Sequence, residues 1–216
     1  QQNTNAESSD IDTWIPLMSI PEILGVTPNN PIISSTYIKT REDLINKWSN
    51  QLNSPDKLTI GIKWQGFQGN ERLFNQSIGR SLPLSKFKLI ADNFNVEFVS
   101  LQKDEGSEQI SNCGFEEKFT PHLQSVEEER CMLETAAIIM SCDLILTCDS
   151  VIAHLSGALG APTWLLLNSC PEWRWGHAGK TTFWYPNTRL FRQKNQGNWD
   201  DVVQNIAKEM THFIKA

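Results

Sequence analysis

The sequence of 216 residues contains no apolar run near the roughly 18 residues that a membrane-spanning helix needs. It also shows no signal-peptide pattern, because residues 1–10 are polar and have neither a basic region nor an apolar core. Lys and Arg are never clustered, and the formal net charge of -6 argues against nucleic-acid binding. We therefore expect a protein with no membrane span and no nucleic-acid partner.

Cysteine is present, but not in a pattern that indicates a disulfide framework or a metal site. The five cysteines are odd in number and include no CxxC pair. This usage fits reduced thiols and a cytoplasmic location, with Cys142 and Cys148 in the core and no metal bound. The signatures GxGxxG and GxxxxGK followed by Ser or Thr are also absent. Neither a dinucleotide-dependent oxidoreductase nor a P-loop enzyme is therefore favoured.

The clearest pattern in the chain runs from residue 143 to residue 160. Leu144 to Cys148 is a short apolar run that predicts a buried parallel strand. Asp149 and Ser150 follow, and both residue types favour helix N-caps. Apolar residues then recur at helical spacing up to a stop signal at Gly160, after which Thr163 to Leu167 predicts the next strand. The pattern is strand, tight turn, helix, strand.

The rest of the chain divides into three parts by composition. We expect a disordered tail over 1–13, a connector segment with a helix over 14–56, and the main domain over 57–216. In the main domain we expect further strands at 58–64, 96–101 and 189–192, helices at 83–94, 133–140 and 200–213, and an acidic surface excursion at 103–130. This alternation predicts an α/β fold, a Rossmann-like doubly wound and mostly parallel sheet with helices on both sides.

Five segments, in this order, resemble one family. They are Gly61-Ile-Lys-Trp-Gln-Gly, Ser77-Ile-Gly-Arg80, Phe98-Val-Ser-Leu-Gln-Lys103, Asp149-Ser-Val-Ile-Ala-His154 and Pro171-Glu-Trp-Arg-Trp175. Together they are similar to the C-terminal domain of GT-B glycosyltransferases of the heptosyltransferase type. The version found in bacterial tetratricopeptide-repeat proteins, which is related to the O-linked N-acetylglucosamine transferases, is the most similar. The resemblance covers roughly residues 14 to 214.

The resemblance implies that the chain is one half of a GT-B fold. In such enzymes this half binds a nucleotide-diphosphate sugar, while an N-terminal domain holds the acceptor and the catalytic base. We therefore expect inverting, metal-independent transfer without a cofactor in the full enzyme, and no catalytic residue in this chain alone. The missing N-terminal domain and an acceptor, either saccharide or protein, are the expected partners, and the apolar residues near 14–26 are a candidate homodimer contact.

The resemblance also assigns residues to the diphosphate. The amides of Ser150, Val151 and Ile152, with the Ser150 hydroxyl, would hold it at a helix N-terminus. Many members have threonine and glycine where this chain has Ser150 and Val151. Arg80 would supply a cation to the leaving group, and the remaining candidates are Lys63, Gln65, Asn75, Ser77, Lys103, Asp149 and His154.

Several of these residues have a plainer interpretation. Asp149 is either the helix cap or a contact to the nucleotide sugar, and Arg80 and Lys103 are either ligands or solvated surface residues. His154 either donates to the diphosphate or is a buried histidine satisfied by a backbone carbonyl. The segment 173–175 is either a loop that packs on the domain or a platform for the base. Two alternative functions also remain: a non-catalytic partner-binding module, and a nucleotide-sugar epimerase-like protein.

Overall fold

The computed structural model describes residues 13–31, 36–52, 55–67, 79–103, 105–120 and 132–215. The chain separates into two compact units, residues 1–32 and residues 33–216. The small unit contains a 3-10 turn, η2 (Leu17–Ser19), the one-turn helix α1 (Ile20–Ile23) and a bridge between Thr27 and Asn30. Most of its apolar side chains are exposed, with Trp14 at 83% and Leu17 at 78%.

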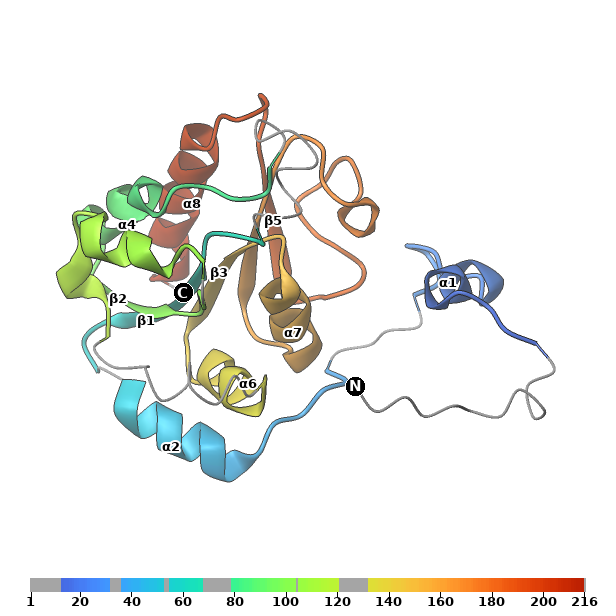
Figure 1. The fold of residues 1–216 in the computed structure, drawn as a ribbon, viewed down its shortest axis with the longest axis horizontal. Helices are drawn as coiled ribbons and strands as arrows, with labels where there is room; N and C mark the ends of the chain where they lie inside the picture. The colour runs from blue at the N-terminus through green and yellow to red at the C-terminus, as the bar shows by residue number, and fades with distance from the viewer. Residues whose placement is uncertain are drawn as a thin grey trace. The chain divides into compact units, whose positions relative to one another are not determined.

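The large unit is built on a five-stranded parallel sheet of order β2-β1-β3-β4-β5 (Figure 1). The strands are β1 (Leu58–Lys63), β2 (Val96–Ser100), β3 (Leu144–Cys148), β4 (Thr163–Leu167) and β5 (Thr188–Arg192). β3 and β4 are buried along their whole length, as expected for strands covered on both faces. The prediction of a doubly wound α/β fold is confirmed.

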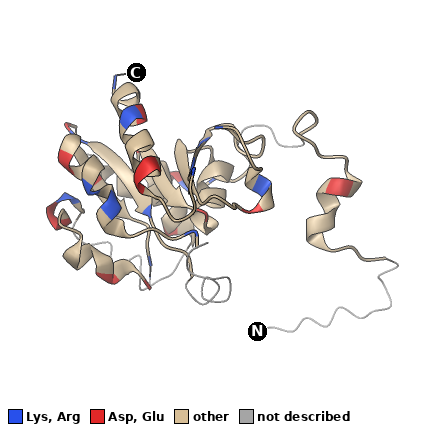
Figure 2. Cartoon of the chain, turned by 90° about the horizontal axis from the view of Figure 1, so that it is seen from above, with Lys and Arg blue, Asp and Glu red and all other residues tan. Residues whose placement is uncertain are grey.

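Helices cover both faces of this sheet (Figure 1). One face carries η4 (Leu84–Phe87), α4 (Lys88–Asn93) and α8 (Asp200–Phe213), whose apolar side chains pack on the strand residues Ile60, Leu144 and Leu146. The other face carries α2 (Glu42–Leu52), α6 (Met132–Met140) and α7 (Val151–Leu159). Basic and acidic residues both occur on the helices of this unit (Figure 2). None of the helices among the described residues has the length and apolar character of a membrane span.

Helix α2 belongs to the large unit through its contacts with α6. The indole N–H of Trp48 donates to the Glu134 carboxylate, and Lys47 Nζ pairs with the same carboxylate at 3.1 Å. Ser49 Oγ lies 3.1 Å from Ser141 Oγ, and Trp48 is only 2% exposed. The division of the chain into a connector over 14–56 and a domain over 57–216 stays a prediction.

The prediction of a surface excursion at 103–130 holds only in part: most of its described residues are at the surface, but the segment is folded. Residues 105–120 contain two 3-10 helices, η5 (Ser107–Asn112) and η6 (Glu116–Lys118). Phe115 is 1% exposed and packs with Phe119 against Phe98 of β2. The apolar surface of these two rings outweighs the acidic character of the segment, so the segment covers the sheet. Residues 121–130 lie outside the described residues.

Candidate functional site

The turn between β3 and α7 is closed by Ser150. Its backbone is extended (φ -155°, ψ 174°), and its Oγ accepts a hydrogen bond from the amide of Ile152 at 3.3 Å. The same Oγ lies 3.1 Å from Thr147 Oγ1, within hydrogen-bond distance. At the other end, Gly160 has φ +77° and terminates α7 in the left-handed conformation that favours glycine. The helix cap is therefore Ser150, and the interpretation of Asp149 as the cap is wrong.

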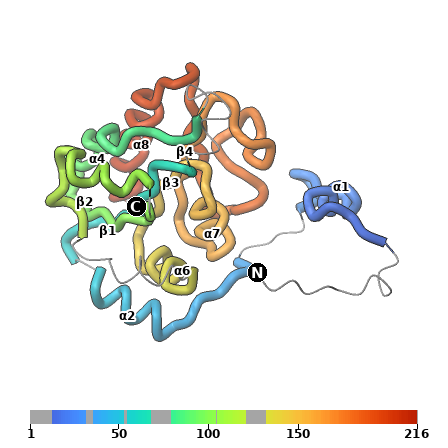
Figure 3. Tube along the Cα trace, viewed as in Figure 1, coloured from blue at the N-terminus to red at the C-terminus, as the bar shows by residue number. Residues whose placement is uncertain are grey.

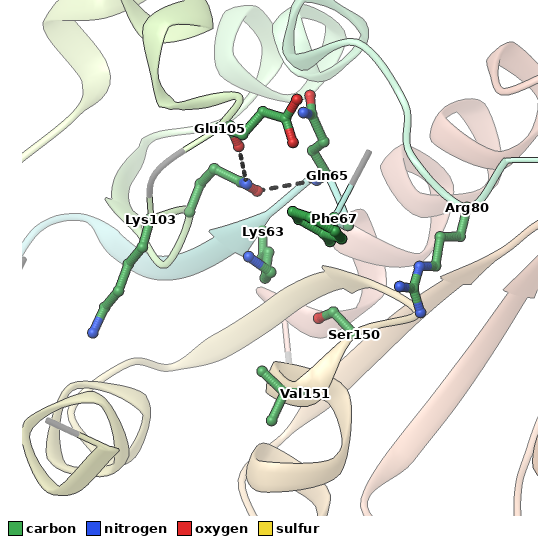
Figure 4. A pocket seen from close by; sticks show the side chains of 10 residues that line it. Lys63, Gln65, Phe67, Arg80, Lys103, Glu105, Ser150 and Val151 are labelled. Atoms are coloured by element: carbon green, nitrogen blue, oxygen red, sulfur yellow. Dashed lines mark hydrogen bonds between the residues drawn. The ribbon is translucent and has the colours of Figure 1, made fainter. Parts of the chain in front are cut away.

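A pocket of about 300 Å³ opens at the carboxyl ends of β1, β2 and β3. Ten residues line it: Lys63, Gln65, Gly66, Phe67, Arg80, Gln102, Lys103, Glu105, Ser150 and Val151. Figure 3 traces the path of β3, α7 and β4, and Figure 4 shows the pocket side chains. Ligands of open α/β sheets bind at this edge, because the loops that follow parallel strands all gather there.

The pocket carries an excess of positive charge although the whole chain is acidic. Among the described lining residues there are three cationic side chains and one carboxylate, a local excess of two positive charges in a chain of net charge -6. Lys63 and Arg80 lie on opposite sides of Ser150 in the view of Figure 4, whereas Lys103 extends away and donates from Nζ to Thr135 Oγ1 at 3.1 Å. With the positive end of the α7 dipole added, this edge suits an anion.

Hydrogen bonds to the residues that follow β1 hold the segment that carries Arg80. Ser81 Oγ accepts from the Gly66 amide at 2.9 Å, and the Leu82 amide donates to Trp64 O at 3.0 Å. These two bonds place Arg80 beside the end of β1, which explains why its charge reaches Asp149. Burial raises the pKa of Asp149, and the Trp175 indole and the charge of Arg80 oppose that rise without cancelling it.

Gln65 is oriented by a chain of side-chain hydrogen bonds. Gln109 Oε1 accepts from the Leu84 amide at 2.9 Å, so its Nε2 is the donor that reaches Gln65 Oε1 at 2.8 Å. The Gln65 backbone amide is in turn held by Gln102 Oε1 at 3.1 Å. These bonds leave Gln65 Nε2 as a buried donor with no partner among the residues that the structure describes.

Position 106, next to the side chain of Gln65, requires glycine. Its φ is +98°, and a Cβ at this position would lie 2.8 Å from Gln65 Cδ. The Glu105 carbonyl, one residue earlier, accepts from Gln102 Nε2 at 2.7 Å. The loop after β2 is therefore in close contact with the side-chain amide of Gln65. An unpaired buried donor of this kind costs about 1–3 kcal/mol.

His154 does not line the pocket. Its Nδ1 lies 3.0 Å from the Tyr185 hydroxyl, and its ring stacks on Trp175 with centroids 5.0 Å apart at 22°. Burial lowers the pKa of His154, which keeps the imidazole neutral, although the nearby Asp149 carboxylate opposes this shift. The imidazole is held by a side-chain hydroxyl rather than by the backbone carbonyl that the sequence argument considered.

The aromatic loop that follows β4 packs on α7 next to His154. It contains η7 (Trp173–Trp175), in which Trp175 is 2% exposed while Trp173 is 54% exposed. A Cβ on Gly157 would lie 2.6 Å from Tyr185 Cδ1, so the absence of a side chain there lets Tyr185 approach the helix. Trp175 and Tyr185 therefore anchor the loop, as the packing interpretation requires. A base platform at Trp173 stays a prediction.

The structure brings together six of the predicted site residues and separates the others. Lys63, Gln65, Arg80, Lys103, Ser150 and Val151 line the pocket, whereas Asp149, Ile152 and His154 do not. Ile152 is 4% exposed in the core, and its amide is taken by Ser150. Ser77 and Asn75 lie outside the described residues. Sequence reasoning missed Phe67, Gln102, Glu105 and the positioning residue Gln109; of these, Gln102 carried a signal, a polar residue directly after a predicted strand.

The fold and the position of the pocket define a doubly wound α/β domain with a ligand pocket at the carboxyl ends of its strands. No protein-family model matches the sequence. Protein FlbA of Caulobacter vibrioides is 23% identical over 158 residues, which are 71% of this chain and 25% of that protein.

Two solved structures share the fold. The ADP-heptose LPS heptosyltransferase II of E. coli superposes with a TM-score of 0.55 at 15% identity, over 86% of this chain and 55% of that one. The family 9 glycosyl transferase of Veillonella parvula DSM 2008 superposes with a TM-score of 0.57 at 16% identity, over 92% of this chain and 59% of that one. The chain thus spans about a quarter of the curated relative and somewhat more than half of each solved structure. At these identities the likeness shows the fold, a Rossmann-like domain of the kind found in heptosyltransferases.

Proposed function

We propose that this chain is the donor-binding half of a glycosyltransferase and that its pocket binds a nucleotide-diphosphate sugar. The observation that carries the proposal is the convergence of Lys63, Arg80 and the start of α7 on one pocket at the carboxyl ends of the strands. The structural neighbours support it, since they are glycosyltransferases and one of them is named for ADP-heptose. The pocket volume is near the lower limit of small-molecule sites, about 300–1,000 Å³.

The proposed chemistry needs stabilisation of a leaving group. When the bond between the sugar and the diphosphate breaks, negative charge develops on the diphosphate oxygens. Arg80, Lys63 and the backbone at Ser150 and Val151 would stabilise that charge at fixed positions, as catalytic electrostatic groups do. On this proposal the transfer is inverting and needs no metal, and the acceptor and catalytic base come from an N-terminal domain. The tetratricopeptide-repeat context and the cytoplasmic location stay predictions.

Isothermal titration with UDP, ADP and GDP, each with and without EDTA, tests the donor site. We expect one diphosphate to bind and EDTA to change nothing. Arg80→Gln and Lys63→Gln should each weaken binding by about 10-fold or more, because a hydrogen bond to a charged group contributes about 1.5–3 kcal/mol. Lys208→Gln, on the exposed side of α8, is the matched control and should bind as the unmodified chain does. Equal weakening in all three variants would contradict a specific site.

Activity is a separate question from binding. On this proposal the 216-residue chain binds its donor but transfers no sugar to saccharide or protein acceptors beyond slow donor hydrolysis. Product analysis by mass spectrometry with a radiolabelled donor measures this. Transfer by the isolated chain would refute the requirement for a second domain, and a change of configuration in the recovered donor sugar would favour the epimerase-like alternative.

A non-catalytic binding module is the second candidate, and one observation favours it. The Ser150 hydroxyl is already engaged by Thr147 and by the Ile152 amide, and Val151, which is 59% exposed, places an isopropyl group at the pocket. Both features reduce the room and the donors available to a diphosphate. If none of the three diphosphates binds although the chain is folded, this candidate replaces the first.

A further inference from the structure

A second pocket, of about 590 Å³, lies at the edge of the sheet that β5 forms. Residues of β5, of α8 and of the loop before β5 line it, and none of them lines the first pocket. β5 is the last strand of the sheet, on the opposite side of β4 from β3, as Figure 1 shows. The volume is well within the range of small-molecule sites, about 300–1,000 Å³.

The side chains around this second pocket carry uncompensated positive charge. Four of them are cationic, Lys180, Arg189, Arg192 and Lys194, and Glu209 is the one carboxylate among the described lining residues. Arg189 and Glu209 form an ion pair at 2.5 Å and so neutralise each other. The other three cations therefore have no carboxylate partner among the lining residues.

Arg192 is the one of these cations whose side chain is fixed by the surrounding backbone. Its guanidinium donates to the carbonyls of Gly179 at 3.0 Å, Gly176 at 2.9 Å and Ala178 at 3.3 Å, and also to that of Trp175. Burial lowers its pKa, and no nearby carboxylate raises it again. One N–H of Nη1 has no acceptor in the described part of the chain. A half-buried cation that is matched only by carbonyl dipoles gains from a nearby anion.

The next residue, Gln193, adds a buried donor. Its Oε1 accepts from the amides of Ser169 at 3.3 Å and Gly197 at 3.2 Å, which sets the orientation of the side-chain amide. Gln193 is 6% exposed, and its Nε2 has no hydrogen-bond partner in the described part of the chain. The Gln193 amide nitrogen is fully enclosed, so this residue shapes the wall of the pocket next to Arg192.

The edge of β5 is closed to an added strand, which favours a small molecule over an extended peptide. The Leu190 amide donates to Lys180 O at 2.8 Å, and Thr181 forms an antiparallel bridge with Arg189. This segment occupies the backbone groups that strand addition would need. The four carbonyl contacts of Arg192 also hold the wall of the pocket in place, so a ligand meets a pre-formed site.

The geometry points to the second pocket as a binding site for a small polyanion, a phosphate ester or a polycarboxylate. Lys180 and Lys194 supply charge at the rim, and Arg192 supplies a further cation at the wall. The inference does not depend on the proposed donor site, because the two pockets share no residue.

Titration with inorganic pyrophosphate and with citrate tests this site. A Lys63→Gln/Arg80→Gln double variant serves as the background, so that the first pocket does not contribute. Isothermal titration gives the affinity, and the side-chain amide resonance of Gln193 reports the location by NMR. We expect saturable binding of at least one probe, a shift of the Gln193 resonance, and weaker binding at higher salt.

The charge at the rim provides the specific variants. Lys180 and Lys194 are both exposed, and replacement of either by glutamine should weaken binding of the probe by about 10-fold. Lys208→Gln, which is also exposed but lies outside the pocket, is the matched control and should change affinity less than about twofold. The inference is overturned if neither probe binds in the double-variant background. Equal weakening by all three lysine variants would also overturn it, because it would show non-specific attraction only.

Discussion

Replacement of His154 by alanine distinguishes a ligand-binding histidine from one that holds the aromatic loop. In the structure the imidazole contacts Tyr185 and Trp175, and it does not line the pocket. We therefore expect His154→Ala to destabilise the protein and to leave diphosphate affinity nearly unchanged. The hypothesis that His154 donates to the diphosphate predicts the reverse: weaker binding with little change in melting temperature.

The magnitude follows from the two contacts. Loss of the hydrogen bond to the Tyr185 hydroxyl costs about 1 kcal/mol, and loss of the aromatic stack on Trp175 costs about 0.5–1.5 kcal/mol. Together they give about 2 kcal/mol, before any contribution from the cavity that the imidazole leaves. For a domain of this size 1 kcal/mol lowers the melting temperature by about 2–4 °C, so a decrease of about 4–8 °C is expected.

Differential scanning calorimetry and titration of the diphosphate measure the two quantities on one preparation. His177→Ala is the control, because His177 is an exposed histidine of the same loop and should melt like the unmodified protein. The reasoning is refuted if His154→Ala melts normally but binds the diphosphate about 10-fold more weakly.

The pH dependence of the same variant gives a second check. Because burial lowers the pKa of His154, the unfolded chain takes up this proton at a higher pH than the folded chain. The stability linked to the neutral imidazole is present above the unfolded pKa of about 6.5 and is lost as the pH falls below it. The difference in unfolding free energy between the unmodified protein and His154→Ala should therefore shrink between about pH 7.5 and pH 5.5.

Two further changes test the packing of the helices. Burial raises the pKa of Glu134, but hydrogen bonds from Trp48 and Lys47 outweigh it, so the net pKa is lowered. The carboxylate therefore stabilises the fold above its unfolded pKa, and this contribution is lost as the pH falls through the folded value. In urea unfolding, Glu134→Gln should lose about 1–3 kcal/mol at pH 7 and become equal to the unmodified protein in acid; a constant difference would contradict the assignment. Gly157→Ala should destabilise by about 1–3 kcal/mol and alter the near-UV circular dichroism, because the new Cβ meets the Tyr185 ring. Glycine to alanine in an ordinary helix interior stabilises by about 0.5–1 kcal/mol, so a more stable variant would refute the contact.

Local patterns were enough to predict much of the fold. The run from Leu144 to Cys148 forms β3 within the predicted bounds, and the strand at 163–167 is also as predicted. The stop signal at Gly160 has the left-handed conformation that glycine favours. These features depend on apolar periodicity and on backbone freedom, which neighbouring residues determine among themselves. The segment at 105–120 was missed because its two phenylalanines show no period, and their burial depends on a sheet that other segments build.

The sequence by itself determined the order of strands and helices and the turn after β3, because periodicity and capping act over a few residues. The tertiary structure decided which side chains share a site. The orientation of α7 about its axis turned His154 towards Tyr185, a residue distant in the chain, and two hydrogen bonds to the residues just after β1 placed Arg80 at the pocket. The orientation of Gln65 likewise depends on Gln109 and Gln102, from other segments. Such partners are selected by packing between distant parts of the chain, and no local pattern encodes them.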